Sequence, residues 1–149
     1  MNNSLLETIK EDLIKHEGYK TEIYLCSEGI PTFGIGHAIK EDDPEYTWPV
    51  GTPIEKERID NAFAEDVQTA LTDCNALFLE FSSLPEQVQR VLVNMAFNLG
   101  RTRLGRFQRM IAAVNEGRFK KAADEMVDSR WYNQVGNRSI ELENWMRNA

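Results

Sequence analysis

The chain contains 149 residues, 42% of them hydrophobic and 28% charged, and its formal net charge is −7. This length suits one domain or two tightly packed lobes, and no apolar run approaches the roughly 20 residues that a membrane helix needs. Two cysteines and two histidines without zinc-type spacing argue against a disulfide framework and against a metal site, and we predict no cofactor.

The first expected element is an amphipathic helix over residues 4–16. Ser4 followed by Glu7 suits a capping box at its start, and Gly18 is suited to end it. Glu17 then lies in the last turn, where the negative end of the helix dipole disfavours an ionised carboxylate. This segment is acidic from position 7 and lacks the apolar stretch of a secretory signal, so we expect a cytoplasmic protein.

A β-hairpin is expected next, over residues 21–39, because β-forming residues alternate on both sides of a turn signal. If Gly29 is the centre of the turn, Cys26 and Thr32 are equidistant from it and face each other across the strands. Gly34 and Gly36 lie two and four positions after Thr32 and so are expected on the same face of the strand. Because glycine has no side chain, we expect bare backbone there, where a ligand has room to lie close.

Helical periodicity dominates the rest of the chain. After a polar loop at 42–51, a Thr-Pro-Ile-Glu start signal predicts one long helix over 53–79. Further helices are expected from about 83–86 to Gly100, at 104–115, at 118–128, and from about 137.

These elements predict an α+β fold, mostly α, in one domain over 1–149. The expected parts are a small amino-terminal lobe with the β-hairpin (13–58), a connecting helix (59–79), and a larger helical lobe (80–149 with 1–12).

The charge is distributed unevenly. Residues 1–74 hold 6 basic and 16 acidic residues, whereas residues 75–149 hold 11 and 8, with basic clusters at 101–109 and 117–121. These clusters fit a solvated helix surface, or a face that attracts an anionic polymer such as cell wall or nucleic acid. Because the net charge is negative and no nucleic-acid-binding motif is visible, we predict no nucleic-acid partner.

Three reactive side chains follow one another in the first quarter of the chain. Eight residues separate Glu17 from Cys26, and five separate Cys26 from Thr32. Cleavage of a glycosidic bond needs one group that protonates the leaving oxygen and another that positions or supplies the nucleophile. A second carboxylate would be expected for the latter, so the thiol is the unusual member.

This region resembles the catalytic region of the phage-type lysozymes, the muramidases related to T-even phage lysozyme. Their pattern is Glu, eight residues, Asp or Cys, five residues and Thr, within an EG…T-x-G-x-G-H frame. The similarity continues through VNMAFNLG (93–100) and SRWYNQVGNR (129–138), so it spans nearly the whole chain. The chain departs from the family in its acidic charge and in a longer, more acidic loop at 41–51, which we expect to reshape one end of the cleft.

The resemblance implies a lysozyme-like fold and roles for the three reactive residues. Glu17 is the general acid, and Thr32 helps to position the attacking water. Three roles stay open for Cys26: a weak hydrogen-bond partner of the water, which leaves an inverting reaction; a thiolate nucleophile, which gives a covalent intermediate and retention; or a packing residue.

Other positions are assigned by the same resemblance. Arg138 matches the arginine that family members place against the catalytic glutamate. His37 and Asp66 match a histidine–aspartate pair that ties the hairpin to the long helix, which is a structural role. The substrate-binding positions are Phe97, Asn98, Gln134 and Arg138.

The activity implied by the resemblance is that of a phage endolysin. It cleaves the β-1,4 bond between N-acetylmuramic acid and N-acetylglucosamine in bacterial peptidoglycan and lyses the host. We expect a monomer without a membrane anchor that accumulates in the host cytoplasm and reaches the wall through a holin-type pore. The alternative is a non-catalytic peptidoglycan-binding or wall-associated structural module, since a fold does not fix a function.

Overall fold

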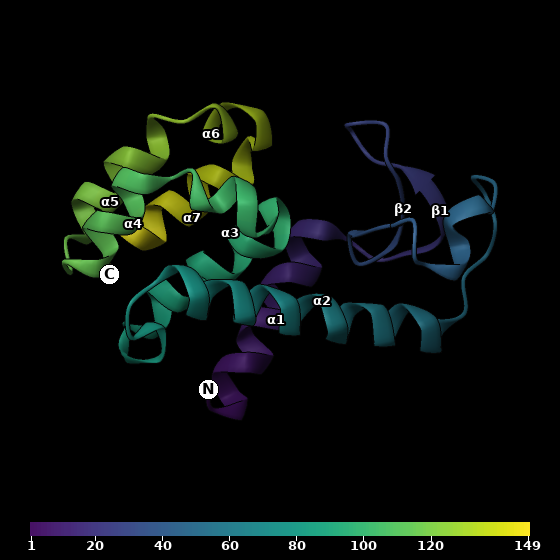
Figure 1. Cartoon of the computed structure of the whole chain (residues 1–149), viewed down its shortest axis with the longest axis horizontal. Coiled ribbons are helices and arrows are strands. Elements are labelled where there is room, and N and C mark those ends of the chain that lie inside the picture. Colours follow the sequence, from purple (N-terminus) through teal and green to yellow (C-terminus); the bar gives the residue numbers. More distant parts are fainter. The chain divides into compact units, whose positions relative to one another are not determined.

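The computed structural model describes residues 1–149 and consists of seven α-helices, two short 3-10 helices and one three-stranded antiparallel sheet (Figure 1). The predicted α+β, mostly α class is therefore confirmed. In chain order the elements are α1 (Asn3–Glu17), β1 (Lys20–Leu25), β2 (Pro31–Gly34), β3 (His37–Ala38), η1 (Pro44–Thr47), α2 (Lys56–Leu77), η2 (Phe81–Ser83), α3 (Glu86–Gly105), α4 (Gln108–Asn115), α5 (Phe119–Val127), α6 (Arg130–Val135) and α7 (Asn137–Arg147).

The chain divides into two compact units. We call residues 10–68 the sheet unit, and residues 1–9 together with 69–149 the helical unit. Both boundaries fall inside helices, one in α1 and one in α2, so each unit contains part of both helices.

In the sheet unit the strands follow the order β1-β2-β3, and neighbours are antiparallel. The segment 51–54 lies along the other edge of β1, where Ile23 accepts a hydrogen bond from the Gly51 N–H (2.7 Å) and donates one to the Thr52 carbonyl (2.9 Å). This pairing covers a strand edge that would otherwise be open. The apolar core of the unit consists of Leu13, Ile23, Phe33, Ile35, Ile39, Ile54, Ile59, Ala62, Phe63 and Val67.

Two helices begin at different places from those predicted. α1 starts at residue 3 because Asn2, and not Ser4, caps it: the Asn2 side-chain oxygen accepts the Leu5 N–H at 2.7 Å. α2 starts at Lys56 rather than at residue 53, because the backbone groups just before it pair with β1.

The hairpin turn is centred one residue earlier than expected. The Cys26 N–H donates to the Ile30 carbonyl at 3.0 Å, and Tyr24 is the cross-strand partner of Thr32. The predicted face-to-face pairing of Cys26 with Thr32 is therefore wrong. Since side chains alternate along a strand, Tyr24, Cys26 and Thr32 still share one face of the ribbon.

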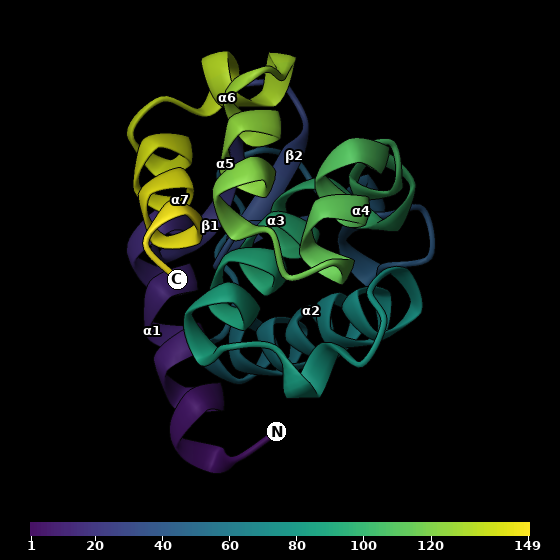
Figure 2. The same cartoon turned by 90° about the vertical axis from the view of Figure 1, so that its left-hand side faces the viewer.

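The helical unit is built from α3 to α7 with parts of α1 and α2. α3 is interrupted at Gly100 (φ 79°, ψ 166°), where the sequence predicts a helix end, and a further helical stretch continues to Gly105. The expected helix at 104–115 is shorter, because Phe107 leaves helical geometry and α4 starts at Gln108. Helix α5 lies between α4 and α7 (Figure 2), and α7 also packs on α3.

The core of the helical unit is mostly apolar but also contains a few buried polar side chains, namely Asp73, Gln89, Asn94, Ser139 and Glu143. Its fully buried side chains include those of Val88, Val91, Leu92, Val93, Met95, Leu104, Met126, Leu142 and Met146. None of the helices combines the length and the apolar character that crossing a membrane requires.

Candidate active site

Glu17 is the last residue of α1, and its carboxyl group packs against the backbone of Gly36. The helix ends because Gly18 adopts a positive φ of 80° while its N–H still donates to the Ile14 carbonyl (2.8 Å). A Cβ atom at Gly36 would lie 2.7 Å from both Cδ and Oε1 of Glu17. The turn before β3 therefore needs a glycine, and it fixes one side of a half-buried acid.

The two glycines of the hairpin region make room for the protein's own side chains. A Cβ at Gly34 would lie 2.8 Å from a methyl group of Ile59 on α2, just as one at Gly36 would meet Glu17. The expectation that Gly34 and Gly36 leave space for a ligand is therefore wrong. Their function is to let α2 and α1 approach the ribbon closely.

Thr32 is buried, with only 3% of its surface exposed. Its hydroxyl group donates a hydrogen bond to the Ile30 carbonyl at 2.8 Å. Because the hydroxyl proton is used in this way, only the lone pairs of the Thr32 oxygen remain for another partner.

Cys26 is a free, half-buried cysteine at the end of the hairpin turn. Its carbonyl accepts the Gly29 N–H at 2.8 Å, so the turn holds its backbone in place. The second cysteine, Cys74, is buried in α2, and burial, followed by the charge of Asp73, raises the pKa of its thiol. Cys26 is thus the more reactive of the two thiols.

Tyr24 is a member of this group that the sequence analysis missed. It is half-buried, it lies opposite Thr32, and its ring shares a ribbon face with Cys26. Burial raises the pKa of the Tyr24 phenol, and the negative charges of Glu17 and Cys26 raise it further. The alternation of the segment TEIYLC already placed Tyr24 on the side of Cys26, and this was the available signal.

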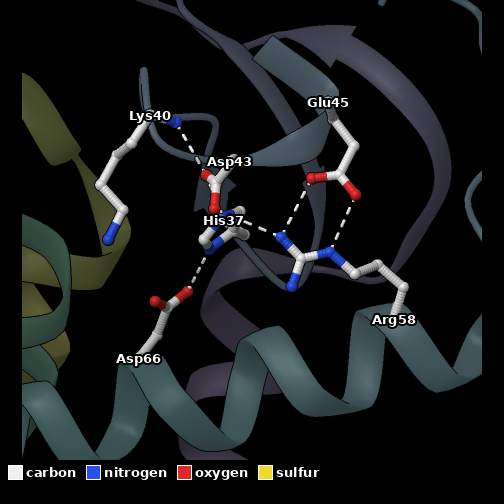
Figure 3. Close-up of polar contacts among 6 residues, drawn as sticks. All are labelled: His37, Lys40, Asp43, Glu45, Arg58 and Asp66. Carbon is white, nitrogen blue, oxygen red and sulfur yellow. Dashed lines mark hydrogen bonds and ion pairs between the residues drawn. The ribbon is translucent and has the colours of Figure 1, made fainter.

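His37 is held between two carboxylates (Figure 3). Its Nδ1 lies 2.7 Å from Asp66 of α2, and its Nε2 lies 2.9 Å from Asp43 of the following loop. Asp43 also accepts the Lys40 N–H at 2.8 Å. An ionised carboxylate only accepts hydrogen bonds, so this arrangement favours an imidazolium that donates from both nitrogens.

Arg58 of α2 extends the same network. Its Nε and Nη2 donate to the two carboxylate oxygens of Glu45 at 2.9 and 3.0 Å, and Nη2 lies 3.3 Å from Asp43. The guanidinium also lies over the Phe33 ring, 5.4 Å from its centroid. Sequence analysis did not predict Asp43, Glu45 or Arg58, because residues 13 to 15 positions apart in a loop and a helix show no spacing signal.

The pKa values of His37, Asp43 and Glu45 all depart from their ordinary values. Burial alone would lower the pKa of His37, but the hydrogen bonds and charges of Asp66 and Asp43 outweigh it and raise the pKa. Burial alone would raise the pKa of Asp43, but its bonds to Lys40 and His37 and the charge of Arg58 lower it. The hydrogen bond from Arg58 lowers the pKa of Glu45. All these groups are therefore stabilised in their charged forms.

The remaining predicted residues belong to the helical unit. Arg138 Nε donates to the side-chain oxygen of Asn94 at 2.8 Å, and Asn94 is buried. Asn98 accepts a hydrogen bond from the Trp131 indole N–H at 2.8 Å. Phe97 is half-buried, and Gln134 is exposed on α6. Glu17, Cys26 and Thr32, by contrast, all belong to the sheet unit.

Residues 14–147 match the family described as phage lysozyme. The chain belongs to the phage lysozyme family. Among its relatives, "Probable T4-type lysozyme 2" of Dictyostelium discoideum is 25% identical over 91% of this chain and 91% of its own length. "Pre-baseplate central spike protein Gp5" of Enterobacteria phage T4 is 28% identical over 95% of this chain and 27% of its own length.

A third relative, "Peptidoglycan hydrolase gp36" of Pseudomonas phage phiKMV, is 28% identical over 87% of this chain and 14% of its own length. The match to the Dictyostelium relative covers most of both chains, whereas this chain corresponds to only one part of the two longer phage proteins. Membership of the phage lysozyme family supports a glycosidase of the lysozyme type. No group of three or more His, Cys, Asp or Glu side chains is placed to hold a metal ion.

Proposed function

We propose that this protein is an N-acetylmuramidase that hydrolyses the β-1,4 bond between N-acetylmuramic acid and N-acetylglucosamine in bacterial peptidoglycan. The observation that carries the proposal is the position of Glu17. Its half-buried carboxyl group packs against Gly36 and lies within electrostatic range of Tyr24, which shares a ribbon face with Cys26 and Thr32. The name of the phiKMV relative, a peptidoglycan hydrolase, supports the choice of substrate.

In the proposed reaction Glu17, in its protonated form, gives its proton to the glycosidic oxygen as the bond to the anomeric carbon breaks. A water molecule attacks that carbon from the opposite face and releases its surplus proton to solvent, from which Glu17 is reprotonated. Thr32 accepts a hydrogen bond from this water, since its own proton is donated to Ile30. Cys26 is the second, weaker partner of the water. The configuration at the anomeric carbon is inverted.

The proposal is tested with purified peptidoglycan by identifying the new reducing end and the anomer released first. The wild type should release N-acetylmuramic acid ends, and Glu17→Gln should lower the rate by about 100-fold or more. Glu11→Gln is the matched control, because Glu11 is an exposed carboxylate on the same helix. Equal rates for wild type and Glu17→Gln would show that Glu17 is not the acid. A retained anomer would assign the attack to the Cys26 thiolate.

The same assay separates the enzyme from a non-catalytic wall-binding module. A module would sediment with peptidoglycan yet release no reducing ends, and Glu17→Gln would bind like the wild type. An enzyme, by contrast, would release reducing ends in proportion to the time of incubation.

We further propose that the protein is a monomeric endolysin which accumulates in the host cytoplasm and acts on the wall after a holin-type pore opens the membrane. The phage origin of two of its relatives supports a role in phage infection. Added to intact bacteria, the protein should leave turbidity unchanged, whereas bacteria with permeabilised membranes should clear. Clearing of intact cells at the same rate would contradict the need for a pore.

A further inference from the structure

Tyr24 belongs to the group of reactive residues in the sheet unit. It pairs with Thr32 across the hairpin and precedes Cys26 by two positions on the same strand, so the three side chains share one face. Glu17 and Cys26 are the titratable groups that act electrostatically on its hydroxyl. No other tyrosine of the sheet unit is placed in this way: Tyr19 and Tyr46 are 42% and 56% exposed.

We propose that Tyr24 is a positioning residue of the hydrolytic site, whose phenol donates a hydrogen bond to the attacking water and so orients it toward the anomeric carbon. This inference rests on the muramidase function proposed above. The phenol adds a hydrogen-bond donor to a site whose other members are the acid Glu17, the acceptor Thr32 and the thiol of Cys26.

The need for a donor follows from the hydrogen bonds of Thr32. Its proton goes to the Ile30 carbonyl at 2.8 Å, so Thr32 offers the water only an acceptor. A thiol is a weak donor and a weak acceptor. A water that donates to Thr32 and Cys26 still has two lone pairs, and its direction of attack is fixed only if one of them is occupied. The phenol of Tyr24 occupies it and leaves the last lone pair for the sugar.

The phenol keeps its proton under working conditions. Burial and the charges of Glu17 and Cys26 all raise its pKa above the ordinary value of about 10. Tyr24 therefore remains a neutral donor even when both neighbours are ionised. A lysine in its place would add a charge beside the acid, and a phenylalanine would remove only the donor.

The test compares Tyr24→Phe with Tyr46→Phe, the latter being a control on an exposed tyrosine of the same unit. Tyr24→Phe should lower kcat on peptidoglycan fragments by about tenfold, the size expected for one lost hydrogen bond, with KM changed less than about twofold. In a Cys26→Ala background the same substitution should cost less than about threefold, because loss of the thiol already leaves the water without a fixed direction, so little remains for the phenol to contribute. Tyr46→Phe should match the wild type.

A second measurement needs neither substrate nor turnover. Iodoacetamide should alkylate Cys26 of the native protein, since Cys74 is fully buried. Tyr24→Phe should slow this alkylation at neutral pH by about threefold, because a water no longer held by the phenol solvates the thiolate less well. Thermal unfolding of both variants establishes that they fold.

The outcomes are distinguishable. If wild type hydrolyses peptidoglycan and Tyr24→Phe equals it in kcat, the positioning role is overturned while the proposed function stands. If kcat falls but alkylation of Cys26 is unchanged, Tyr24 acts through packing and the proposal is also wrong. If the wild type releases no reducing ends, the muramidase function fails and takes this role with it.

Discussion

The two units of the molecule organise their ion-paired side chains differently. In the helical unit most buried side chains are apolar, and its two buried acids, Asp73 and Glu143, each form an ion pair with a more exposed arginine. In the sheet unit His37 and Arg58 lie in one connected cluster with three carboxylates, those of Asp43, Glu45 and Asp66. Apolar burial is non-directional, whereas hydrogen-bonded ion pairs fix the geometry of the groups they join.

This difference matters for the candidate active site. His37 follows Gly36 directly, and Gly36 is the residue against which the Glu17 carboxyl packs. When Asp66 and Asp43 hold both nitrogens of His37, they also hold the turn that contacts Glu17. The polar network of the sheet unit therefore helps to hold the turn that contacts the candidate acid Glu17.

The largest expected effect lies in the helical unit. Replacing Leu142 by alanine removes a fully buried side chain of α7 and should lower the free energy of unfolding by about 2–5 kcal/mol. Ile140→Ala, on the same helix but 45% exposed, should change it by less than about 0.5 kcal/mol. Denaturant titration measures both. Similar losses for the two variants would contradict a core packed through α7.

The contact between Gly36 and Glu17 gives the next effect, measured on activity. In Gly36→Ala the new Cβ would overlap the Glu17 carboxyl and displace it, and a misplacement of about 1 Å costs on the order of 100-fold in rate. Gly29→Ala is a close control: Gly29 has a positive φ of 75°, near the 64° of Gly36, but nothing lies within 4 Å of its Cβ position. Both variants carry similar backbone strain, so only Gly36→Ala should lose most of its hydrolysis of peptidoglycan.

The helices and the acid at the end of α1 were predictable from local patterns. Gly18 signals the helix end, and Glu17 lies at the position expected from it. Gly100 likewise interrupts α3 where the sequence suggests a stop. These features depend on neighbours within one or two turns, and such neighbours are visible in the sequence.

What could not be predicted depends on distant groups. The start of α2 was misplaced because the pairing of residues 51–54 with β1 used the backbone groups that the sequence assigned to a helix cap. The hairpin register was misplaced because the hydrogen bond between Cys26 and Ile30 set the turn, and not the position of Gly29. The partners Asp43 and Arg58 meet only after the loop folds back on α2, so no spacing rule identifies them.

The network in the sheet unit should be sensitive to loss of a single charge. Asp66→Asn removes a carboxylate from the buried His37 and should lower the free energy of unfolding by about 1–3 kcal/mol. Asp60→Asn is the matched control, because Asp60 is on the same helix and pairs with Lys56 at the surface, where such pairs contribute at most about 1 kcal/mol. Equal losses of stability in the two variants would mean that the buried His37–Asp66 pair contributes no more than the exposed Lys56–Asp60 pair.

The smallest expected effect is a pH dependence that arises from the charged network of the sheet unit. The pKa of His37 is raised in the folded state, so its contribution to stability is fully present below the unfolded value of about 6.5 and is lost as the pH rises through the folded value. Asp43 and Glu45 have lowered pKa values, so their contributions are present above their unfolded values and are lost as the pH falls through the folded ones. The network should therefore be strongest in the mildly acidic range between these titrations.

Thermal unfolding of wild type and His37→Gln over pH 5–10 measures the histidine part of this effect. The difference between their melting temperatures should shrink by a few degrees as the pH rises, since about 1 kcal/mol corresponds to about 2–4 °C in a domain of this size. His16→Gln replaces the other histidine of the chain and shows separately how much that residue contributes to the pH dependence. If the difference between wild type and His37→Gln stays constant with pH, His37 is neutral in the folded protein, and the sheet unit is held by hydrogen bonds alone and not by charge.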